Sequence, residues 1–485
     1  MGGAPFRAGR DDLGASGDAP PLDAVLPIRD GSRSMRALIV GAGEVGWYLA
    51  GRLAREGHEV VVLDRDRELL QRRSRQGLDV RVERADAVNP RALREHLAGG
   101  VDLFVAVTAE DASNLLACLL AREQHPADQP PPRTMARVRD GAYYEKGADT
   151  AEGTLGIDLL VSPELAAVGD LASTLRVRGA VRVESFADGR LSLAECLVTE
   201  GSPAAHRALP TRPHATRSKV GAVLRDGRVH LATKDTTPLP GDHLVLCAPR
   251  DQLKEACREI DPTARPIHRV AIFGAGQIGV ALAHRMAEAG REVIVLEPDE
   301  TRARDAAEVL EQRSIEVVWE EGASEDAMRE AGVDTCDAFV SCANDDRTTL
   351  LACTHADRLD IGLVLAVLSR EEFTPLAEAL GVDGTVAPRL AAAERILQTS
   401  RGGLARKSTL LADGLEAIEY TIAEDGPLVG RVPAGSLPRD TLLTAVVRDG
   451  EVLLPKAVER YVAGDEVLVL ATGDGATKLG AVLGS

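Results

Sequence analysis

The stretch Arg36-Ala-Leu-Ile-Val-Gly-Ala-Gly-Glu-Val-Gly46 returns later in the chain as Arg269-Val-Ala-Ile-Phe-Gly-Ala-Gly-Gln-Ile-Gly279. In each copy a continuous apolar run leads into a Gly-x-Gly-x-x-Gly loop, and a helical pattern follows. A buried parallel strand, a tight glycine turn and a helix in this order form the start of a dinucleotide-binding Rossmann unit. The sequence therefore predicts two such units within its 485 residues.

Further landmarks keep the same order in both copies. Asp64 ends the apolar run that follows Gly41, and Glu297 ends the run that follows Gly274 at the same offset. Two later segments also recur: residues 102–108 match residues 337–343, and residues 157–163 match residues 382–388. Ordered matches of this length indicate an internal duplication.

The region after each unit repeats as well. An Asp-Gly turn between two apolar runs lies within residues 223–229 and again within residues 446–452. A Gly-Asp turn and a further apolar run follow each of them at the same distance, at Asp242 and Asp465. Short strands joined by such turns predict a compact β-rich module behind each Rossmann unit.

The predicted fold class is α/β, with two doubly wound parallel-sheet domains that are each followed by a small module. The predicted segments are a disordered tail (1–34), a first Rossmann unit (35–170), its module (180–255), a second Rossmann unit (267–400) and its module (413–485).

The glycine loops are the predicted nucleotide-binding elements. The first glycine permits the tight turn, the second lets a diphosphate approach the backbone, and the third lets the helix pack on the strand. The alternative, that these glycines serve helix packing without a ligand, stays open for both loops. The predicted binding residues of the loops are Gly41, Ala42, Gly43, Glu44, Val45 and Gly46 in the first copy and Gly274, Ala275, Gly276, Gln277, Ile278 and Gly279 in the second.

An acidic residue at the end of the second strand is expected to accept hydrogen bonds from both hydroxyls of the adenosine ribose. Asp64 and Glu297 hold this position, which favours NAD or an adenine nucleotide over NADP. Thr108, the backbone of Ala109, and Arg137 end the next strands and are expected to face the same ligand. Taken alone, each of these three is more often a solvated loop-end residue, and for Arg137 the two interpretations are about balanced.

Features that carry other chemistries are missing from the sequence. The ten histidines have no suggestive acidic or basic partner, and there is no Walker A sequence, zinc-ligand spacing or Gly-x-Ser-x-Gly elbow. We therefore predict no catalytic residues and no metal site, and a protein that is not an enzyme. An NAD-dependent oxidoreductase with a duplicated cofactor domain remains the alternative. The seven cysteines lack a Cys-x-x-Cys pair, as is typical of reduced thiols.

Charge and hydropathy exclude other function classes. The net charge of −18 argues against a broad nucleic-acid surface. No stretch reaches the roughly 18 consecutive apolar residues of a membrane-spanning helix, and the start of the chain lacks the apolar core of a signal peptide. The sequence therefore predicts a cytoplasmic protein with no direct membrane insertion.

A family resemblance rests on several of these motifs together with the doubled turn modules. The motifs are the GAGxVG loop, Asp64, Ala85-Asp86-Ala87, Val105-Ala-Val-Thr108 with Asp111 and Asn114, and Ile157-Asp-Leu-Leu-Val-Ser-Pro-Glu164. The combination resembles an RCK (KTN) domain followed by its α+β C-terminal subdomain. Two of these in tandem resemble the TrkA family, the peripheral regulatory subunits of Trk potassium uptake systems.

The resemblance implies a partner and a ligand. It implies a homo-oligomer, a tetramer by the number of units, at the inner face of the cell membrane beneath an integral-membrane Trk-type potassium transporter subunit. Bound NAD or NADH, or ATP/ADP in its place, is expected to gate potassium uptake by shifting the balance between two conformations. Regulation of potassium efflux is the alternative that the resemblance leaves open.

The two sites are expected to differ. The first copy carries Asp86, Thr108, Asp111, Asn114 and Arg137 where the resemblance implies polar residues around the ligand. We therefore expect the first site to bind a nucleotide tightly and the second to be weak, differently selective or empty. Aligned on the same landmarks, the second copy has Gly322, Ala343, Asp346, Thr349 and Val367 at these positions.

Overall fold

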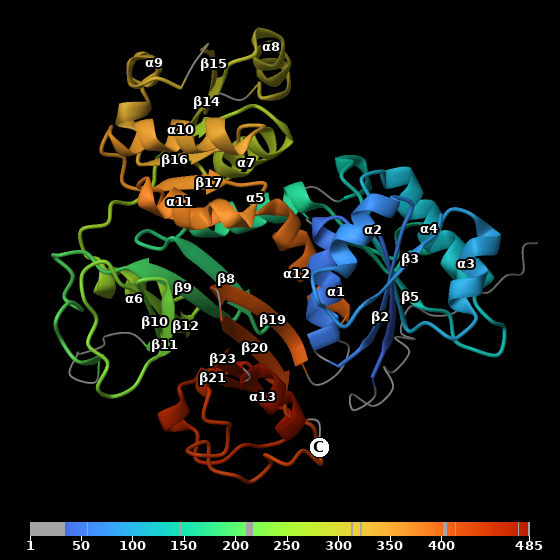
Figure 1. The fold of residues 1–485 in the computed structure, drawn as a ribbon. Coiled ribbons are helices and arrows are strands. Elements are labelled where there is room, and N and C mark those ends of the chain that lie inside the picture. The colour runs from blue at the N-terminus through green and yellow to red at the C-terminus, as the bar shows by residue number, and fades with distance from the viewer. Residues whose placement is uncertain are drawn as a thin grey trace, which may run out of the picture.

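The computed structural model describes residues 34–55, 57–144, 148, 150–209, 217–311, 314–320, 323–400, 405–412, 414–473 and 475–483. This part of the chain forms two Rossmann-type units and two smaller modules, each built on a β-sheet (Figure 1). The predicted N-terminal tail lies outside the described residues except for Ser34.

The first unit is a seven-stranded sheet in the order β3-β2-β1-β4-β5-β7-β6. Neighbouring strands run parallel except at the edge, where β6 pairs antiparallel with β7. The strand order reverses between β1 and β4, which is where open α/β sheets bind their ligands. The elements are β1 (Arg36–Val40), α1 (Glu44–Arg55), β2 (Glu59–Asp64), α2 (Arg67–Ser74), β3 (Arg81–Arg84), α3 (Pro90–Leu97), β4 (Leu103–Ala106), α4 (Asp111–Gln124), β5 (Arg133–Arg137), β6 (Thr150–Glu152) and β7 (Leu159–Val161).

The second unit repeats this order as a six-stranded parallel sheet, β15-β14-β13-β16-β17-β18. The predicted α/β fold class with two doubly wound sheets is therefore confirmed. The elements are β13 (Arg269–Phe273), α7 (Gln277–Glu288), β14 (Glu292–Glu297), α8 (Glu300–Val309), β15 (Ile315–Trp319), α9 (Glu325–Glu330), β16 (Ala338–Ser341), α10 (Asp346–Asp357), β17 (Val364–Val367), α11 (Thr374–Ala379) and β18 (Gly384–Val386).

The duplication extends to individual hydrogen bonds. The carboxylate of Asp102 accepts the backbone N–H of Arg36 at 2.8 Å, and Asp337 accepts that of Arg269 at 2.9 Å. Each bond joins the start of β4 or β16 to the neighbouring central strand. The same device recurs one strand further on, where Asp158 accepts from Thr134 and Asp383 from Val364, both at 2.7 Å.

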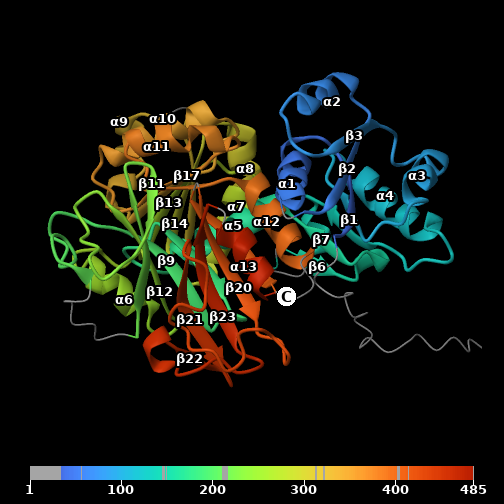
Figure 2. The same ribbon diagram turned by 60° about the horizontal axis from the view of Figure 1, so that its bottom comes forward.

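The helix that follows each sheet packs on the other unit. Val168 and Leu171 of α5 lie in the core of the second unit, beside its central strands. Ala393 and Ile396 of α12 lie in the core of the first unit, where α12 contacts α1 (Figures 1 and 2). The sequence-based boundaries assign each helix to the unit before it and do not foresee this exchange. The two helices are α5 (Pro163–Thr174) and α12 (Pro388–Ser400).

A five-stranded antiparallel sheet follows each unit, in the orders β11-β10-β12-β9-β8 and β19-β20-β23-β21-β22. The predicted Asp-Gly turns join β10 to β11 and β21 to β22, and both central residues have positive φ, 50° at Asp226 and 51° at Asp449. The elements are β8 (Arg182–Phe186), β9 (Leu191–Leu197), β10 (Lys219–Arg225), β11 (Arg228–Leu231), β12 (His243–Pro249), α6 (Leu253–Ile260), β19 (Ala405–Ala412), β20 (Leu415–Thr421), β21 (Thr441–Arg448), β22 (Glu451–Leu453), β23 (Glu466–Thr472) and α13 (Gly475–Leu483).

The repeated Asp of each module has a structural role. Arg225 forms a two-pronged ion pair with Asp242 through Nε at 2.7 Å and Nη2 at 2.6 Å. Arg448 pairs with Asp465 in the same way, at 2.7 and 2.8 Å. Burial alone would raise the pKa of Asp242, but the hydrogen bonds from Arg225 and from the backbone N–H of Leu239, together with the charge of Arg225, hold that pKa below its usual value. Each ion pair therefore links a Gly-Asp turn to the neighbouring hairpin.

The two modules pack against each other within one chain. Phe186 and Leu193 of the first share a hydrophobic cluster with Leu468 and Leu470 of the second. The buried carboxylate of Glu419 also accepts the backbone N–H of Ala187 at 2.8 Å across this contact. Together with the exchanged helices, this interface joins the two halves of the chain (Figure 2).

Candidate functional site

The first glycine loop joins β1 to α1, and its three glycines have separate roles. Gly41 has a φ of 109°, and a Cβ at this position would lie 3.1 Å from the backbone of Val107. A Cβ on Gly46 would lie 1.9 Å from the carbonyl oxygen of Gly41, so the helix requires glycine there to pack on the strand. A Cβ on Gly43 would meet nothing within 4 Å. The backbone around Gly43 is thus open to a ligand, as expected of a diphosphate-binding loop.

A cleft of about 610 Å³ opens at this loop, at the carboxyl ends of the first sheet. It brings together most of the residues predicted for the first site. Ala42 and Gly46 are buried behind it. Asp86, which the family resemblance implied, also lines the cleft. The predicted residues that line it are Gly41, Gly43, Glu44, Val45, Asp64, Thr108, Ala109 and Arg137.

Asp64 has acceptor capacity to spare at the rim of the cleft. One of its carboxylate oxygens accepts the backbone N–H of Ala42 at 2.7 Å, and the other accepts that of Asp66 at 2.9 Å. A carboxylate offers about four lone-pair positions, so each oxygen can take one donor more. The pair of hydroxyls on an unmodified ribose supplies two donors, and this arrangement fits them.

Asn114 organises the opposite wall of the cleft. Its side-chain oxygen accepts both the N–H and the hydroxyl of Thr108, at 2.8 and 2.7 Å. Its amide donates to the carbonyls of Thr108 and Arg137, at 3.1 and 2.8 Å. Asn114 is fully buried, so it acts as a positioning residue that fixes the ends of β4 and β5. The family resemblance implied a polar residue around the ligand at this position, and the structure gives Asn114 a role in positioning Thr108 and Arg137.

One residue of the cleft comes from the other half of the chain. Arg389, at the start of α12, lines the cleft and forms an ion pair with Glu44 of the first glycine loop. No local sequence signal points to this contact, because it depends on the exchange of α12 between the units. In the opposite direction, Gln277 of the second loop donates to the carbonyl of Arg139 at 2.7 Å, and Arg139 also lines the first cleft.

The cleft gathers five arginines beside four carboxylates, in a chain whose net charge is −18. Arg73 donates to the carbonyl of Ala42 at 3.1 Å and lies over the ring of Trp47. Burial lowers the pKa of Arg73 and that of Arg137 from their usual values, because desolvation disfavours the charged form. Cationic groups near the amide end of α1 favour a bound anion such as a diphosphate. The arginines that line the cleft are Arg65, Arg73, Arg137, Arg139 and Arg389.

The second loop, which includes the predicted residues Ala275, Gln277 and Ile278, has the same backbone plan as the first. Gly274 has a φ of 104°, and a Cβ on Gly279 would lie 1.9 Å from the carbonyl oxygen of Gly274. A Cβ on Gly276 would lie 3.7 Å from the side chain of Asn344. The glycines that the fold itself requires are thus kept in both loops.

The acidic residue of the second loop differs in its partners. Glu297 is only 2% exposed, and its Oε2 accepts the backbone N–H of Ala275 at 2.7 Å. Its Oε1 accepts from Asp299 N at 2.9 Å and from Arg302 through Nε at 3.1 Å and Nη2 at 2.6 Å. The position predicted to receive the ribose is therefore filled by a side chain of the protein.

The polar wall of the first cleft is replaced around the second loop. Judged by the strand registers and the helix starts, Ala343, Thr349 and Val367 hold the positions equivalent to those of Thr108, Asn114 and Arg137. This agrees with the sequence alignment. The side-chain oxygens of Ser341 and Thr349 are buried without a hydrogen-bond partner among the described residues. The second loop thus lacks the network that Asn114 builds in the first unit.

One position of that alignment was wrong. Asn89 and Ser324 are the N-caps of α3 and α9, so the residue three positions before each cap corresponds. Ala85 and Glu320 confirm the register, because each donates its N–H to the carbonyl of the acidic residue, Asp64 or Glu297. Position 321, a glutamate, and not Gly322, is therefore the counterpart of Asp86. Residues 321 and 322 lie outside the described residues, and the landmark alignment missed the shift because the intervening loop differs in length.

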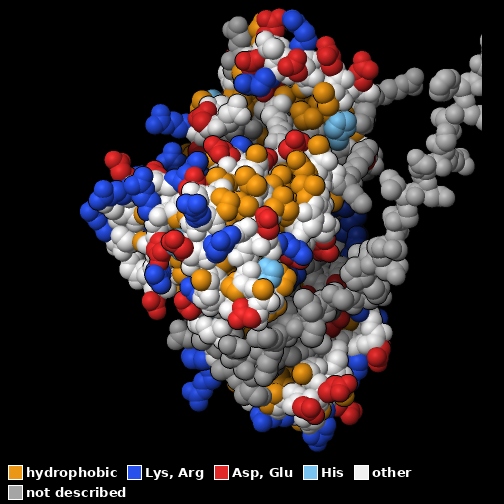
Figure 3. All heavy atoms as spheres, turned by 90° about the vertical axis from the view of Figure 1, so that its right-hand side faces the viewer, with side chains coloured by type: hydrophobic (Ala, Val, Ile, Leu, Met, Phe, Trp, Pro, Cys, Tyr) orange, Lys and Arg blue, Asp and Glu red, His pale blue; other side chains and the backbone are white. Residues whose placement is uncertain are grey.

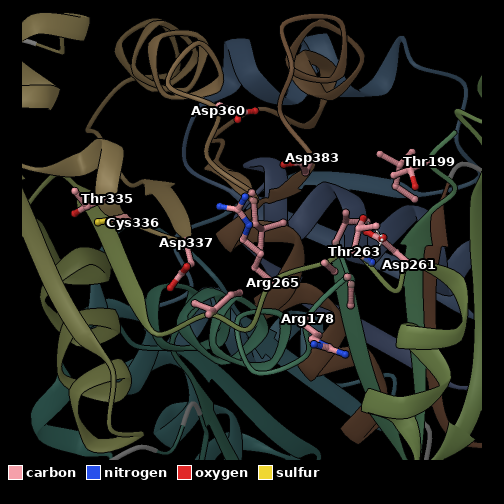
Figure 4. Close-up of a pocket in the computed structure, with 18 of the residues that line it drawn as sticks. Arg178, Thr199, Asp261, Thr263, Arg265, Thr335, Cys336, Asp337, Asp360 and Asp383 are labelled. Atoms are coloured by element: carbon pink, nitrogen blue, oxygen red, sulfur yellow. Dashed lines mark hydrogen bonds between the residues drawn. The ribbon is translucent and has the colours of Figure 1, made fainter. Parts of the chain in front are cut away.

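A second cavity, of about 640 Å³, lies between the first module, the linker before β13 and the amino edge of the second sheet (Figure 4). Figure 4 shows Arg265 near its centre, with Asp337 and Asp383 around it. Both carboxylates hold backbone N–H groups at strand starts, as their counterparts Asp102 and Asp158 do in the first unit. These two acids of the cavity therefore have a structural explanation.

The described part of the chain contains neither a metal-binding cluster nor a membrane-spanning helix. No group of three or more His, Cys, Asp and Glu side chains is arranged there to hold a metal ion. Among the helices described, none has the length and apolar character to cross a bilayer. All seven cysteines are buried free thiols.

Comparisons with known proteins agree with the duplicated architecture. The family model of the TrkA-N domain matches the chain twice, at residues 37–163 and 270–388. The Trk system potassium uptake protein TrkA of Azorhizobium caulinodans is 31% identical over 454 residues, covering 91% of this chain and 96% of that protein. The TrkA homolog 1 of Methanosarcina mazei is 28% identical, covering 92% of this chain and 99% of that protein.

Solved structures show the same fold over nearly the whole chain. The crystal structure of the GsuK RCK domain superposes with a TM-score of 0.56 at 19% identity, covering 92% of this chain and 94% of that one. The GsuK channel bound to NAD gives the same TM-score at 18% identity, covering 95% of this chain and 81% of that one. At these identities the likeness shows the fold and nothing finer.

Proposed function

We propose, on the premise that the chain belongs to the TrkA family of potassium uptake proteins, that it is a nucleotide-sensing regulatory subunit of a Trk-type potassium transporter. The observation that carries the proposal is the first cleft. It combines a glycine loop open at Gly43, a carboxylate with two acceptor positions left at Asp64, and arginines for a diphosphate. NAD or NADH is the proposed ligand, with ADP or ATP as the alternative.

The cleft also suggests how a bound nucleotide would act at a distance. Its phosphates would lie beside Glu44 and Arg389, which belong to different halves of the chain. A nucleotide shifts a conformational equilibrium only by its difference in affinity for the two conformations. Because Arg389 sits on the exchanged helix α12, contact with it ties that affinity to the relative placement of the two units.

The proposed assembly is a homo-oligomer, with a tetramer as the expected size. Figure 3 shows hydrophobic side chains gathered on the face that lies at the right of Figure 1, where the first unit is. The exposed leucines of that unit are Leu116 and Leu119 on α4 and Leu155. α10 of the second unit carries the exposed Leu351 at the position that matches Leu116. Contacts between α4 of one copy and α10 of another would use equivalent surfaces and would bury both.

Light scattering at micromolar concentration tests this assembly. We expect a mass near four chains for the wild type and a smaller species for Leu116→Glu with Leu119→Glu, since a buried unpaired charge is costly. A monomeric wild type with nucleotide present would contradict the assembly and leave the proposed binding site untouched.

The regulatory role is tested in cells that lack their own Trk regulatory subunits and carry a Trk-type membrane subunit. The wild-type chain should restore potassium uptake, and the Asp64→Ala variant should not. Asp128 is an exposed acidic residue in a loop away from the cleft, and the Asp128→Ala variant should behave as the wild type. Restored efflux in place of uptake would favour the efflux regulator. Turnover of NAD(H) by the purified chain, with a range of alcohols and carbonyl compounds, would favour the oxidoreductase; we expect none.

A further inference from the structure

We propose that Arg302 determines the nucleotide selectivity of the second glycine loop by occupying its ribose-binding position, so that this loop does not bind nucleotides through a free ribose diol. The inference rests on the proposed function of the first cleft, because the same position in that cleft serves as the reference.

The two carboxylates differ in how many donors they already hold. Asp64 accepts two backbone N–H groups, one on each oxygen. Glu297 accepts the two equivalent N–H groups and, in addition, two N–H groups of Arg302 on its Oε1. With two lone-pair positions on each oxygen, Asp64 keeps one position on each oxygen for a diol. In Glu297, Oε1 is filled and only Oε2 keeps one position, so this carboxylate cannot accept both hydroxyls of a diol.

The residue that makes the difference is found at one position. Arg302 stands five residues after Glu297 on α8, and Leu69 stands five residues after Asp64 on α2. Leu69 lines the first cleft. Asp66 and Asp299 cap these two helices, which confirms that the positions correspond. A leucine therefore leaves the ribose position open in the first unit, and an arginine fills it in the second.

The interaction that a ribose would have to displace is a strong one. Glu297 is nearly fully buried, and a buried carboxylate that loses a charged partner is left poorly compensated. Two neutral hydroxyls form weaker hydrogen bonds to it than a guanidinium does. The hydrogen bond to Glu297 also raises the pKa of Arg302, so the guanidinium stays charged.

Reciprocal substitutions test the proposal in the full-length chain. Calorimetric titration with NADH and with ADP measures the affinity and the number of nucleotides bound per chain. Leu69→Arg should weaken binding in the first cleft by about a hundred-fold, the loss expected for two hydrogen bonds to a charged group. Arg302→Leu should add a second, weaker binding event. Arg304→Leu, which removes a surface arginine from the same helix, is the matched control and should bind as the wild type.

The diol itself is tested with 2′,3′-dideoxy-ADP. In the wild type it should bind about a hundred-fold more weakly than ADP, and in Leu69→Arg the two should bind alike, because the substitution and the missing hydroxyls remove the same contacts. The proposal is overturned if Leu69→Arg binds ADP as the wild type does. It is also overturned if the wild type binds two nucleotides with similar affinity. A wild type that binds none of these nucleotides contradicts the proposed function itself.

Discussion

The two glycine loops of this chain share a backbone plan and differ in what surrounds them. In both, a glycine with strongly positive φ begins the turn and another lets the helix pack against that turn. Around the first loop, Asp64 and the Asn114 network leave a cleft with free acceptors. Around the second, Glu297 is held by Arg302, and Thr349 stands where Asn114 would be. A glycine loop therefore persists for reasons of packing, and its presence alone does not establish a ligand.

The largest expected contrast is in nucleotide affinity. Asp64→Ala removes both acceptors for the ribose, and we expect at least a hundred-fold weaker binding of the nucleotide, from hydrogen bonds worth about 1.5–3 kcal/mol each. Glu297→Ala should change the tight binding less than about two-fold. Titration of both variants measures the contrast. Loss of the tight phase in Glu297→Ala alone would reverse the assignment of the two sites.

The modules provide the opposite case, in which the two copies should respond alike. Asp242→Ala and Asp465→Ala each leave an arginine without its two-pronged partner and release a turn, and each should lower the free energy of unfolding by about 3 kcal/mol. Thermal unfolding checks this. Replacing Arg448 and Asp465 together by leucine should cost less than Asp465→Ala, because no unpaired charge remains. A much larger loss for one module than for the other would show that the modules, too, have diverged.

Asp383, in the second half of the chain, should make the free energy of unfolding depend on pH. Burial raises its pKa to about 6, against the hydrogen bond from Val364 and with the help of the nearby Asp357. Its proton is held more tightly in the folded chain than in the unfolded chain, where the carboxyl pKa is about 3.9. This contribution to stability is therefore present below about pH 4 and is lost as the pH rises through about 6, for a total of about 2–3 kcal/mol.

Asp383→Asn, which keeps an oxygen for the Val364 N–H, should remove that part of the pH dependence and stabilise the chain near neutral pH. Unfolding measured in urea from about pH 4 to about pH 7.5 compares the variant with the wild type. Parallel profiles for the two proteins would mean that Asp383 is not the source.

The smallest expected effect concerns the contact between the halves. Arg389→Ala removes one partly exposed cation from the first cleft and should weaken nucleotide binding by about three- to ten-fold. Glu44→Gln, which removes the carboxylate that holds Arg389, should strengthen binding slightly, because the arginine is then free to contact the phosphates. Opposite signs for these two variants would sharpen the proposed coupling, and equal losses in both would contradict it.

Much of the fold followed from the sequence because it depends on local patterns. The glycine loops, the acidic strand ends and the Asp-Gly hairpins are each encoded within a few neighbouring residues, and the structure has them where they were predicted. The TrkA family, inferred from the order of these motifs, is confirmed by the family model and the relatives.

The remainder depends on contacts between distant segments. The exchange of α5 and α12 brings Arg389 into contact with Glu44, although the two residues are far apart in the sequence. No local sequence pattern predicts this contact. The difference at Arg302 could have been found from the sequence, because an alignment of the residues after Asp64 and Glu297 pairs Arg302 with Leu69. The alignment does not show how deeply Glu297 is buried. That burial decides whether the arginine points to solvent or pairs with the neighbouring carboxylate.

The number of nucleotides held by each chain tests this account most directly. Equilibrium dialysis of the purified full-length protein against NADH and against ADP, at concentrations well above the dissociation constant of the tight phase, gives that number without any substitution. We expect one nucleotide per chain, bound in the first cleft. Two nucleotides of similar affinity per chain, or none, would contradict it.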